Sequence, residues 1–333
     1  MTEIKIQDFE SYGNWINNQD ESAGNVESIN VISPYFDKKI ASIPASNSEH
    51  LDSAVEAASA AFLNWSRTNI RDRAQIMSRF KSIIENDIEN LATIIALDNG
   101  KTIEDAIGSI KRGVEVIDFA ISMPNVLKGE SSEVSPGINC VMTHEPIGVV
   151  SGITPFNFPV MVPLWMIPLA ITAGNTFILK PSEQTPLAAI KLAEYLEKAG
   201  LPKGVFNVVH GSKDIVEAIC DHPKIKAVAF VGSSKVAEIV YSRSTQKKKR
   251  AICLGGAKNH MIVVPDADVD STAKGLLASS MGSAGQRCMA ASVAVGVEDV
   301  DHIIDQLIKE ANQFKLGRDM GTIISKASLD RIT

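Results

Sequence analysis

The sequence predicts an α/β fold built around a doubly wound, mostly parallel sheet. From Ile147 onward, short apolar runs alternate with longer segments of helical periodicity, which is the rhythm of consecutive βαβ units. A chain of 333 residues, 45% of them hydrophobic, is long enough for this sheet and a second, partial domain. Charged residues make up 22% of the chain, as in ordinary globular proteins.

The segment before the sheet is expected to contain short strands and then helices. Residues 12–45 read as short strands and turns. Ser46 and Glu49 have the spacing of a capping box, which predicts that a helix begins there. Two further helices are expected over Arg71–Leu97 and Thr102–Ser122, since their apolar residues recur at helical spacing.

A hairpin is predicted over residues 127–145. Gly129 and the pair Pro136-Gly137 separate extended segments there, and little apolar sequence is available to build a local core. A hairpin without its own core needs a partner to cover it, so we expect this one to protrude.

The alternating region gives five strands and four helices. The predicted strands are Ile147–Ile153, Thr176–Leu179, Val205–Val209, Ala227–Val231 and Ala251–Leu254. The predicted helices are Val160–Ala173, Pro186–Ala199, Asp214–Cys220 and Lys235–Arg243. In such a sheet the loops at the carboxyl ends of the strands are where ligands bind.

Composition excludes several classes of protein. A net charge of −6 argues against a nucleic-acid partner, and no apolar run reaches the length that would place the chain in a membrane. Residues 1–8 resemble neither a signal nor a transit segment. The four cysteines have no metal-type spacing, so no metal site is expected, and a reduced, cytoplasmic compartment fits best.

Cys288 is the candidate nucleophile. It lies in Gly285–Ala290, between a helix predicted over Asp270–Ser283 and the apolar run Ser292–Val297. A thiol among small residues between a helix and a strand is open to a substrate. The alternative is a structural cysteine, which is what most lone cysteines are.

Polar residues follow three of the predicted strands. Asn157 stands in a Pro-flanked turn after the first strand, where its amide could stabilise an oxyanion. Lys180 and Glu183 come at the end of the second strand, and Gly232-Ser233 opens a helix after the fourth. The free N–H groups of that helix start could receive a pyrophosphate, although no Gly-x-Gly-x-x-Gly follows the first strand.

Together, Asn157, Lys180, Glu183 and Cys288 resemble the pattern of the aldehyde dehydrogenase superfamily. The segments Pro155–Glu183, Gly256–His260 and Cys288–Ala290 are most similar to the CoA-acylating methylmalonate-semialdehyde dehydrogenases within it. The resemblance implies that Cys288 attacks the aldehyde, that Asn157 stabilises the oxyanion, and that Arg112 and Arg287 hold the substrate's carboxylate.

The same resemblance implies NAD as the cofactor and coenzyme A as the cosubstrate. The residues that would hold NAD are Thr154, Pro155, Phe156, Lys180, Ser182, Glu183, Gly232 and Ser233. Hydrolytic members carry a glutamate that activates the deacylating water, in a Glu-Leu-Gly-Gly motif. Here that motif reads Cys253-Leu254-Gly255-Gly256, and its lack of a carboxylate favours acyl transfer to a thiol.

Two alternatives stay open. One is a hydrolytic enzyme whose base comes from elsewhere, and the other is a non-catalytic nucleotide-binding or subunit-interaction fragment. The resemblance implies an NAD-binding domain over 1–122 and 146–253, an oligomerisation hairpin over 123–145 and a catalytic domain over 254–333. The family pattern continues beyond Thr333, so we expect a C-terminally truncated chain whose activity is open, of a kind that forms homo-oligomers at full length.

Overall fold

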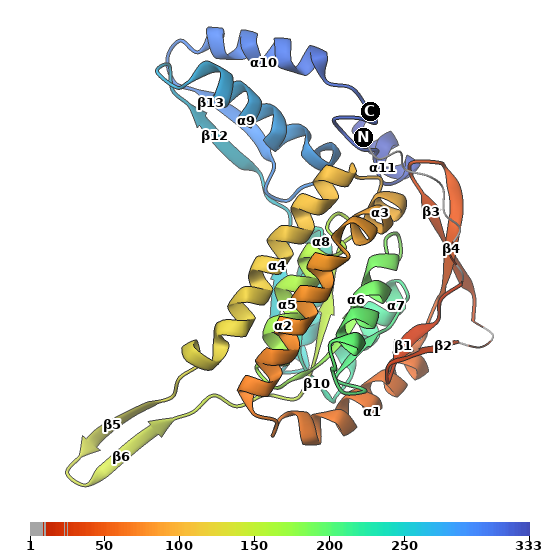
Figure 1. The fold of residues 1–333 in the computed structure, drawn as a ribbon, viewed down its shortest axis with the longest axis vertical. Coiled ribbons are helices and arrows are strands. Elements are labelled where there is room, and N and C mark those ends of the chain that lie inside the picture. The colour runs from red at the N-terminus through yellow and green to blue at the C-terminus, as the bar shows by residue number, and fades with distance from the viewer. Residues whose placement is uncertain (1–8, 10, 23, 25) are drawn as a thin grey trace.

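The computed structural model describes residue 9, residues 11–22, residue 24 and residues 26–333. Residues 1–8, over which no signal or transit segment is expected, lie outside this part. Within the described residues the core is a seven-stranded sheet (Figure 1). From one edge to the other, its strands are β11 (Arg250–Leu254), β10 (Ile225–Val231), β7 (Val149–Ile153), β8 (Thr176–Lys180), β9 (Phe206–Val208), β1 (Asn14–Ile16) and β2 (Gln19–Glu21).

The parallel sheet predicted from the βα alternation is confirmed. The five strands β11, β10, β7, β8 and β9 each run parallel to their neighbour. Strands β1 and β2 extend the β9 edge with antiparallel pairing, and they come from the N-terminal region of short strands and turns.

Helices cover both faces of the sheet, because alternate residues of a buried strand point to opposite sides. Phe177 and Leu179 of β8 pack into one helix layer, whereas Ile178 packs into the other. The first layer contains α2 (Ile70–Asn86), α3 (Ile88–Asn99), α4 (Ile103–Val126), α5 (Met161–Thr172) and α6 (Leu187–Lys198). The second contains α1 (Ser48–Trp65), α7 (Lys213–Asp221) and α8 (Ser234–Gln246).

The single helix predicted over Arg71–Leu97 is wrong, since the structure has α2 and α3 with Asp87 between them. Asp87 departs from helical geometry, at φ −115° and ψ 21°. Its carboxylate accepts hydrogen bonds from the Tyr195 hydroxyl on α6 and from the Asn90 amide. A contact with a distant helix therefore accompanies the break, and apolar spacing within the segment does not reveal it.

The predicted capping box is wrong by one residue. Helix α1 is capped by Asn47, whose side-chain oxygen accepts from the N–H groups of Glu49 and His50 at 3.1 and 3.3 Å. Ser46 is buried instead, and its hydroxyl accepts a hydrogen bond from the Asn14 amide at 2.9 Å.

Two hairpins stand outside the main sheet. Strands β3 (Ser28–Ser33) and β4 (Lys38–Pro44) pair beside α3. Strands β5 (Glu130–Ser135) and β6 (Ile138–Met142) form the hairpin predicted over 127–145, and every residue of both strands is exposed. Figure 1 shows β5 and β6 projecting beyond the end of α4, so the predicted protruding arm is confirmed.

Residues 259–333 form a separate layer, in the blue colours of Figure 1. Strands β12 (Asn259–Val263) and β13 (Ala291–Gly296) pair in parallel. They pack with α9 (Val269–Met281) and α10 (Asp301–Gln313), and α11 (Lys326–Ile332) follows. The helix predicted to Ser283 ends at Met281. None of the helices in the described residues has the length and apolar character needed to cross a bilayer.

Candidate active site

The loop that carries Cys288 links α9 to β13. It begins with a short 3-10 turn in which Ser283 and Ala284 have left-handed backbone geometry, at φ 53° and 56°. That geometry costs a residue with a Cβ about 1–2 kcal/mol, so other contacts must hold the turn. At the other end, the Asn259 amide donates to the carbonyl oxygen of Cys288 at 2.8 Å, and the Cys288 side chain is left half-buried.

Gln286 connects this loop to two other segments, residues 322–324 and the turn of Asn157. Its side-chain oxygen accepts from the N–H of Ile324 at 3.1 Å, and its amide donates to the carbonyl of Thr322 at 3.3 Å. Its backbone carbonyl accepts from Nδ2 of Asn157 at 2.7 Å. Through Gln286, the loop of Cys288 and the turn of Asn157 are therefore in direct contact.

Asn157 is held by this contact in the turn between β7 and α5. Its amide nitrogen has two hydrogens, and the bond to Gln286 uses one of them. Its side-chain oxygen is buried and accepts no hydrogen bond from the described residues. One donor is thus left to bind an added oxygen atom, as an oxyanion hole requires.

Arg112, Arg287 and Cys288 line one cavity of about 500 Å³. Arg112 reaches it from α4, whereas the other two belong to the loop after α9. Much of the remaining wall is apolar and comes from Val116, Phe158, Met161, Trp165 and Met289. The structure therefore brings together the predicted nucleophile and both predicted substrate-binding arginines, while Asn157 lies outside this wall.

The two guanidinium groups differ in how they are held. Nη1 of Arg287 donates to the carbonyl of Ala278 at 3.2 Å. Within the described residues, no hydrogen bond or ion pair engages Arg112. A pair of guanidinium groups in a partly apolar cavity can bind a carboxylate by several charge-assisted hydrogen bonds.

The predicted dinucleotide residues follow three neighbouring strands. Thr154, Pro155 and Phe156 follow β7, Lys180, Ser182 and Glu183 end or follow β8, and Gly232 and Ser233 follow β10. These strands are adjacent and parallel, so their carboxyl ends lie at one edge of the sheet. The N–H of Thr154 donates to the carbonyl of Lys180 at 3.1 Å, which joins the first two groups.

The chemistry of this edge fits NAD. Lys180 is buried, and its Nζ is 3.0 Å from Oε2 of the half-buried Glu183, so an ammonium and a carboxylate are available to ribose hydroxyls. Ser233 caps α8 without a side-chain hydrogen bond to the helix. The N–H groups of that first turn can therefore receive a pyrophosphate.

Cys253 and Leu254, one of which the resemblance matches to the hydrolytic glutamate, lie at the end of β11. Burial raises the pKa of the Cys253 thiol to about 11, so it stays protonated at neutral pH and cannot serve as a base. Three carboxylates, those of Glu104, Asp105 and Glu115, line the same cavity as Cys288.

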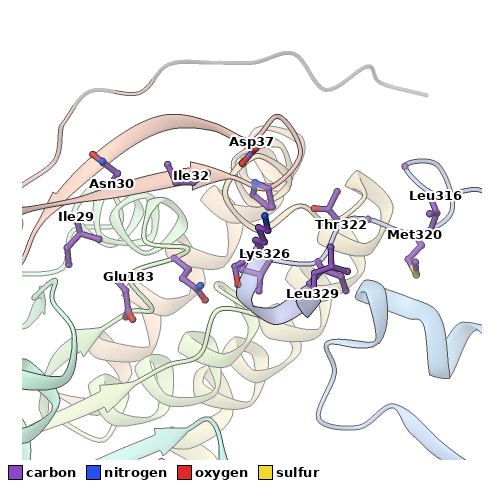
Figure 2. A pocket seen from close by; sticks show the side chains of 17 residues that line it. Ile29, Asn30, Ile32, Asp37, Glu183, Leu316, Met320, Thr322, Lys326 and Leu329 are labelled. Carbon is purple, nitrogen blue, oxygen red and sulfur yellow. The ribbon is translucent and has the colours of Figure 1, made fainter. Parts of the chain in front are cut away.

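A larger cavity of about 830 Å³ lies elsewhere, between β3 and the segment from Leu316 to Leu329. Figure 2 shows Ile32 on the β3 side and Lys326 and Leu329 on the α11 side of it. Of the predicted site residues, Glu183 lies on its wall and Cys288 does not. Cavity size alone would therefore direct attention away from the candidate nucleophile.

Two residues of this site, Gln286 and Lys101, are not among those predicted from the sequence. Gln286 lies inside the segment singled out for Cys288, but nothing in its spacing marks it as a tie between segments. Lys101 follows the helix-ending Gly100, where a lysine is ordinarily solvated, yet it is 3% exposed. Within the described residues, no group of three or more His, Cys, Asp or Glu side chains could hold a metal ion.

Comparison with protein families finds one match that covers most of the chain. The model of the aldehyde dehydrogenase family matches residues 21–333. The chain is 45% identical over 320 residues to the malonate-semialdehyde dehydrogenase of Pseudomonas aeruginosa, and 44% identical over 321 residues to that of Bacillus pumilus. These alignments cover 93% and 95% of this chain but 64% and 65% of those relatives, so the chain spans about two thirds of their length.

Solved structures are similar over nearly the whole chain. A putative methylmalonate-semialdehyde dehydrogenase from Sinorhizobium meliloti, complexed with NAD, superposes with a TM-score of 0.95 at 41% identity, covering 98% of this chain and 68% of that one. The methylmalonate-semialdehyde dehydrogenase of Oceanimonas doudoroffii gives a TM-score of 0.91 at 42% identity, covering 93% and 64%.

Proposed function

The chain belongs to the aldehyde dehydrogenase family, and from this premise we propose that it is an NAD-dependent, CoA-acylating dehydrogenase of malonate or methylmalonate semialdehyde. The observation that carries the proposal is the single cavity lined by Cys288, Arg112 and Arg287. A semialdehyde of this class has a carboxylate one carbon away from its aldehyde. Two guanidinium groups beside a thiol suit such a molecule, because one end can be held while the other reacts.

In the first step, the Cys288 sulfur adds to the aldehyde carbon and the carbonyl oxygen becomes an oxyanion. The free N–H of the Asn157 amide donates to that oxygen, and a charged acceptor makes this hydrogen bond stronger. Arg112 and Arg287 hold the carboxylate at the far end, so the aldehyde carbon stays within reach of the sulfur.

NAD, when bound along the carboxyl edge of the sheet, supplies the acceptor for the hydride that leaves this carbon. Lys180 and Glu183 would hold the adenosine ribose, and the first turn of α8 at Gly232-Ser233 would hold the pyrophosphate. The negative charge of Glu183 disfavours the 2′-phosphate of NADP, because like charges repel. What stays on the protein is a thioester on Cys288.

The thioester is then passed to coenzyme A. The CoA thiolate attacks the acyl carbon, the bond to the Cys288 sulfur breaks, and the free cysteine returns. Neither Cys253 nor Leu254 can activate a water molecule, so the thioester should last until a thiol arrives. We assign residues 1–122 and 146–253 to NAD binding, 123–145 to oligomerisation and 254–333 to the catalytic part of a homo-oligomeric enzyme.

The test is NADH formation from NAD⁺ and methylmalonate semialdehyde, measured with and without CoA. We expect steady turnover with CoA, and without it at most about one NADH for each Cys288. Cys288→Ala is expected to remove both. Cys140→Ala is the matched control, because Cys140 is an exposed cysteine on the hairpin far along the chain from the site.

One observation favours a second candidate, a hydrolytic aldehyde dehydrogenase. Glu104 and Glu115 are exposed carboxylates on α4, and they share the cavity with Cys288. Either could activate a water molecule in place of the absent glutamate. NADH formation that continues without CoA past one turnover for each site, and that falls in Glu104→Gln or Glu115→Gln, would select this function.

A further inference from the structure

We propose that Lys101 is a positioning residue, whose side chain ties the loop of Cys288 to the turn of Asn157. The proposal rests on the proposed function for the catalytic roles of those two residues. Lys101 lies in the short link between α3 and α4, and its side chain is buried. A buried lysine is rare in proteins unless it has a partner, and this one has partners on two segments of the site.

The first partner is on the nucleophile loop. Nζ of Lys101 is 2.6 Å from Oγ of Ser283, a buried residue at the start of the loop. The backbone N–H of Ser283 also donates to Oδ2 of Asp105 at 3.0 Å. Ser283 is thus held through its side chain and its backbone while its φ stays left-handed.

The second partner is on the turn of Asn157. The Lys101 ammonium lies 4.0 Å from the centroid of the Phe158 ring, which is the geometry of a cation–π contact. Phe158 directly follows Asn157 and lines the cavity that holds Cys288. One side chain therefore touches both segments that carry the proposed chemistry, and it does so from behind the cavity wall rather than from inside the cavity.

The strength of this tie depends on charge. Burial lowers the pKa of Lys101 to about 7; Asp105 acts to raise it and Arg287 to lower it further. Below pH 7 the ammonium is charged, so both the cation–π contact and the attraction to Asp105 are present. Above pH 7 the neutral amine keeps a weaker hydrogen bond to Ser283 and loses the contact with the ring.

The cysteines of the chain provide a test that needs neither substrate nor cofactor. Iodoacetamide labelling, followed by peptide mass spectrometry, gives a rate for each thiol. The rate at Cys288 measures how accessible its loop is. The rate at the exposed Cys140 measures the reactivity of the reagent, and the rate at the buried Cys220 measures global unfolding. In Lys101→Met we expect the Cys288 rate, relative to Cys140, to rise at least about fivefold, because a lost charge-assisted bond frees the loop. Cys220 should not change.

Two further variants guard against a folding defect. Ser283→Ala removes the acceptor without touching the buried charge and should raise the Cys288 rate in the same direction. In the natural protein, the Cys288 rate relative to Cys140 should rise further as the pH passes 7 and Lys101 loses its charge. Lys101→Arg keeps a charge at all accessible pH values, so this further rise should be absent from it. If the chain makes no NADH but the variants show the expected labelling rates, the proposed function is contradicted and the positioning role of Lys101 is not. Unchanged Cys288 rates in both Lys101→Met and Ser283→Ala, or an equal rise at Cys220, would overturn the tie.

Discussion

At the scale of single residues, Arg112 shows what the sequence could and could not reveal. Apolar spacing predicts which face of the helix carries Arg112. That Arg112 lines the same cavity as Cys288 depends on how α4 packs against the loop after α9. Within the described residues its side chain makes no hydrogen bond or ion pair, so its guanidinium group is available to bind a ligand.

Replacing Arg112 by glutamine should weaken the binding of a charged substrate specifically. We expect Arg112→Gln to raise the KM for the semialdehyde by about tenfold or more, since hydrogen bonds to charged groups are worth about 1.5–3 kcal/mol. The KM for propionaldehyde, which has no carboxylate, should change little. Lys111→Gln is the control, because Lys111 is exposed on the same helix and does not line the cavity. An equal rise for both aldehydes would contradict the assignment.

His210 carries a prediction about acid stability. It is fully buried, neither ring nitrogen has a partner among the described residues, and burial lowers its pKa to about 3. In the unfolded chain its pKa is about 6.5. Between these values the unfolded state binds the extra proton, so stability falls as the pH drops below about 6.5.

Urea titrations at pH 7 and pH 5 test this effect. His210 alone should account for a loss of about 2 kcal/mol in the free energy of unfolding, at 1.36 kcal/mol for each pH unit. His210→Gln should show a smaller loss by that amount, even though its stability at pH 7 is lower. His260→Gln, at an exposed position on β12, should keep the full loss. Parallel pH curves for His210→Gln and the natural protein would be incompatible with a neutral buried histidine.

At the scale of elements, periodicity predicted most helices and strands but not their interruptions. The parallel strands follow from short apolar runs between helices, which is local information. The break at Asp87 is accompanied by a hydrogen bond from Tyr195, and the displacement of the cap from Ser46 to Asn47 by one from Asn14 to Ser46, and both partners lie far away in sequence. Apolar spacing likewise predicts that Ser283 ends a helix, whereas the structure places it in a left-handed turn that is held by Lys101 and Asp105.

The junction of α3 and α4 is the element we expect to be most sensitive to a single methyl group. Gly100 ends α3 at φ 84°, and an added Cβ would lie 2.0 Å from Oγ1 of Thr322 and 2.8 Å from Pro34. Gly100→Ala should lower the free energy of unfolding by about 1–3 kcal/mol, through backbone strain and the clash. It should also loosen Thr322, whose N–H donates to the Gly100 carbonyl.

Gly275→Ala is the matched control for this prediction. Gly275 lies within α9, with nothing inside 4 Å of an added Cβ, so alanine should stabilise the helix by about 0.5–1 kcal/mol. Thermal or urea unfolding of both variants checks the pair. A neutral effect of Gly100→Ala would mean that the link before Lys101 is not packed as described.

At the scale of the whole molecule, the site is assembled from segments that are far apart in the chain. The loops after β7, β8 and β10 lie together at one edge of the sheet. Any doubly wound sheet places such loops together, because its strands are parallel. The cavity that Cys288 shares with α4, and the hydrogen bond from Asn157 to Gln286, both join the last layer of the chain to the first helix layer. No local sequence pattern predicts contacts between these two layers. A family resemblance therefore identifies the site residues, but the sequence does not predict how they are arranged in space.

The most direct test of the central claim is to trap the acyl group on Cys288. The chain is mixed with NAD⁺ and methylmalonate semialdehyde without CoA, quenched in acid after one turnover, and digested for mass spectrometry. We predict an acyl adduct on the Cys288 peptide that persists for many turnover times and disappears when CoA is added, with acyl-CoA released. An adduct that is lost equally fast without CoA, or an adduct absent from Cys288 despite NADH formation, would contradict thioester transfer to coenzyme A.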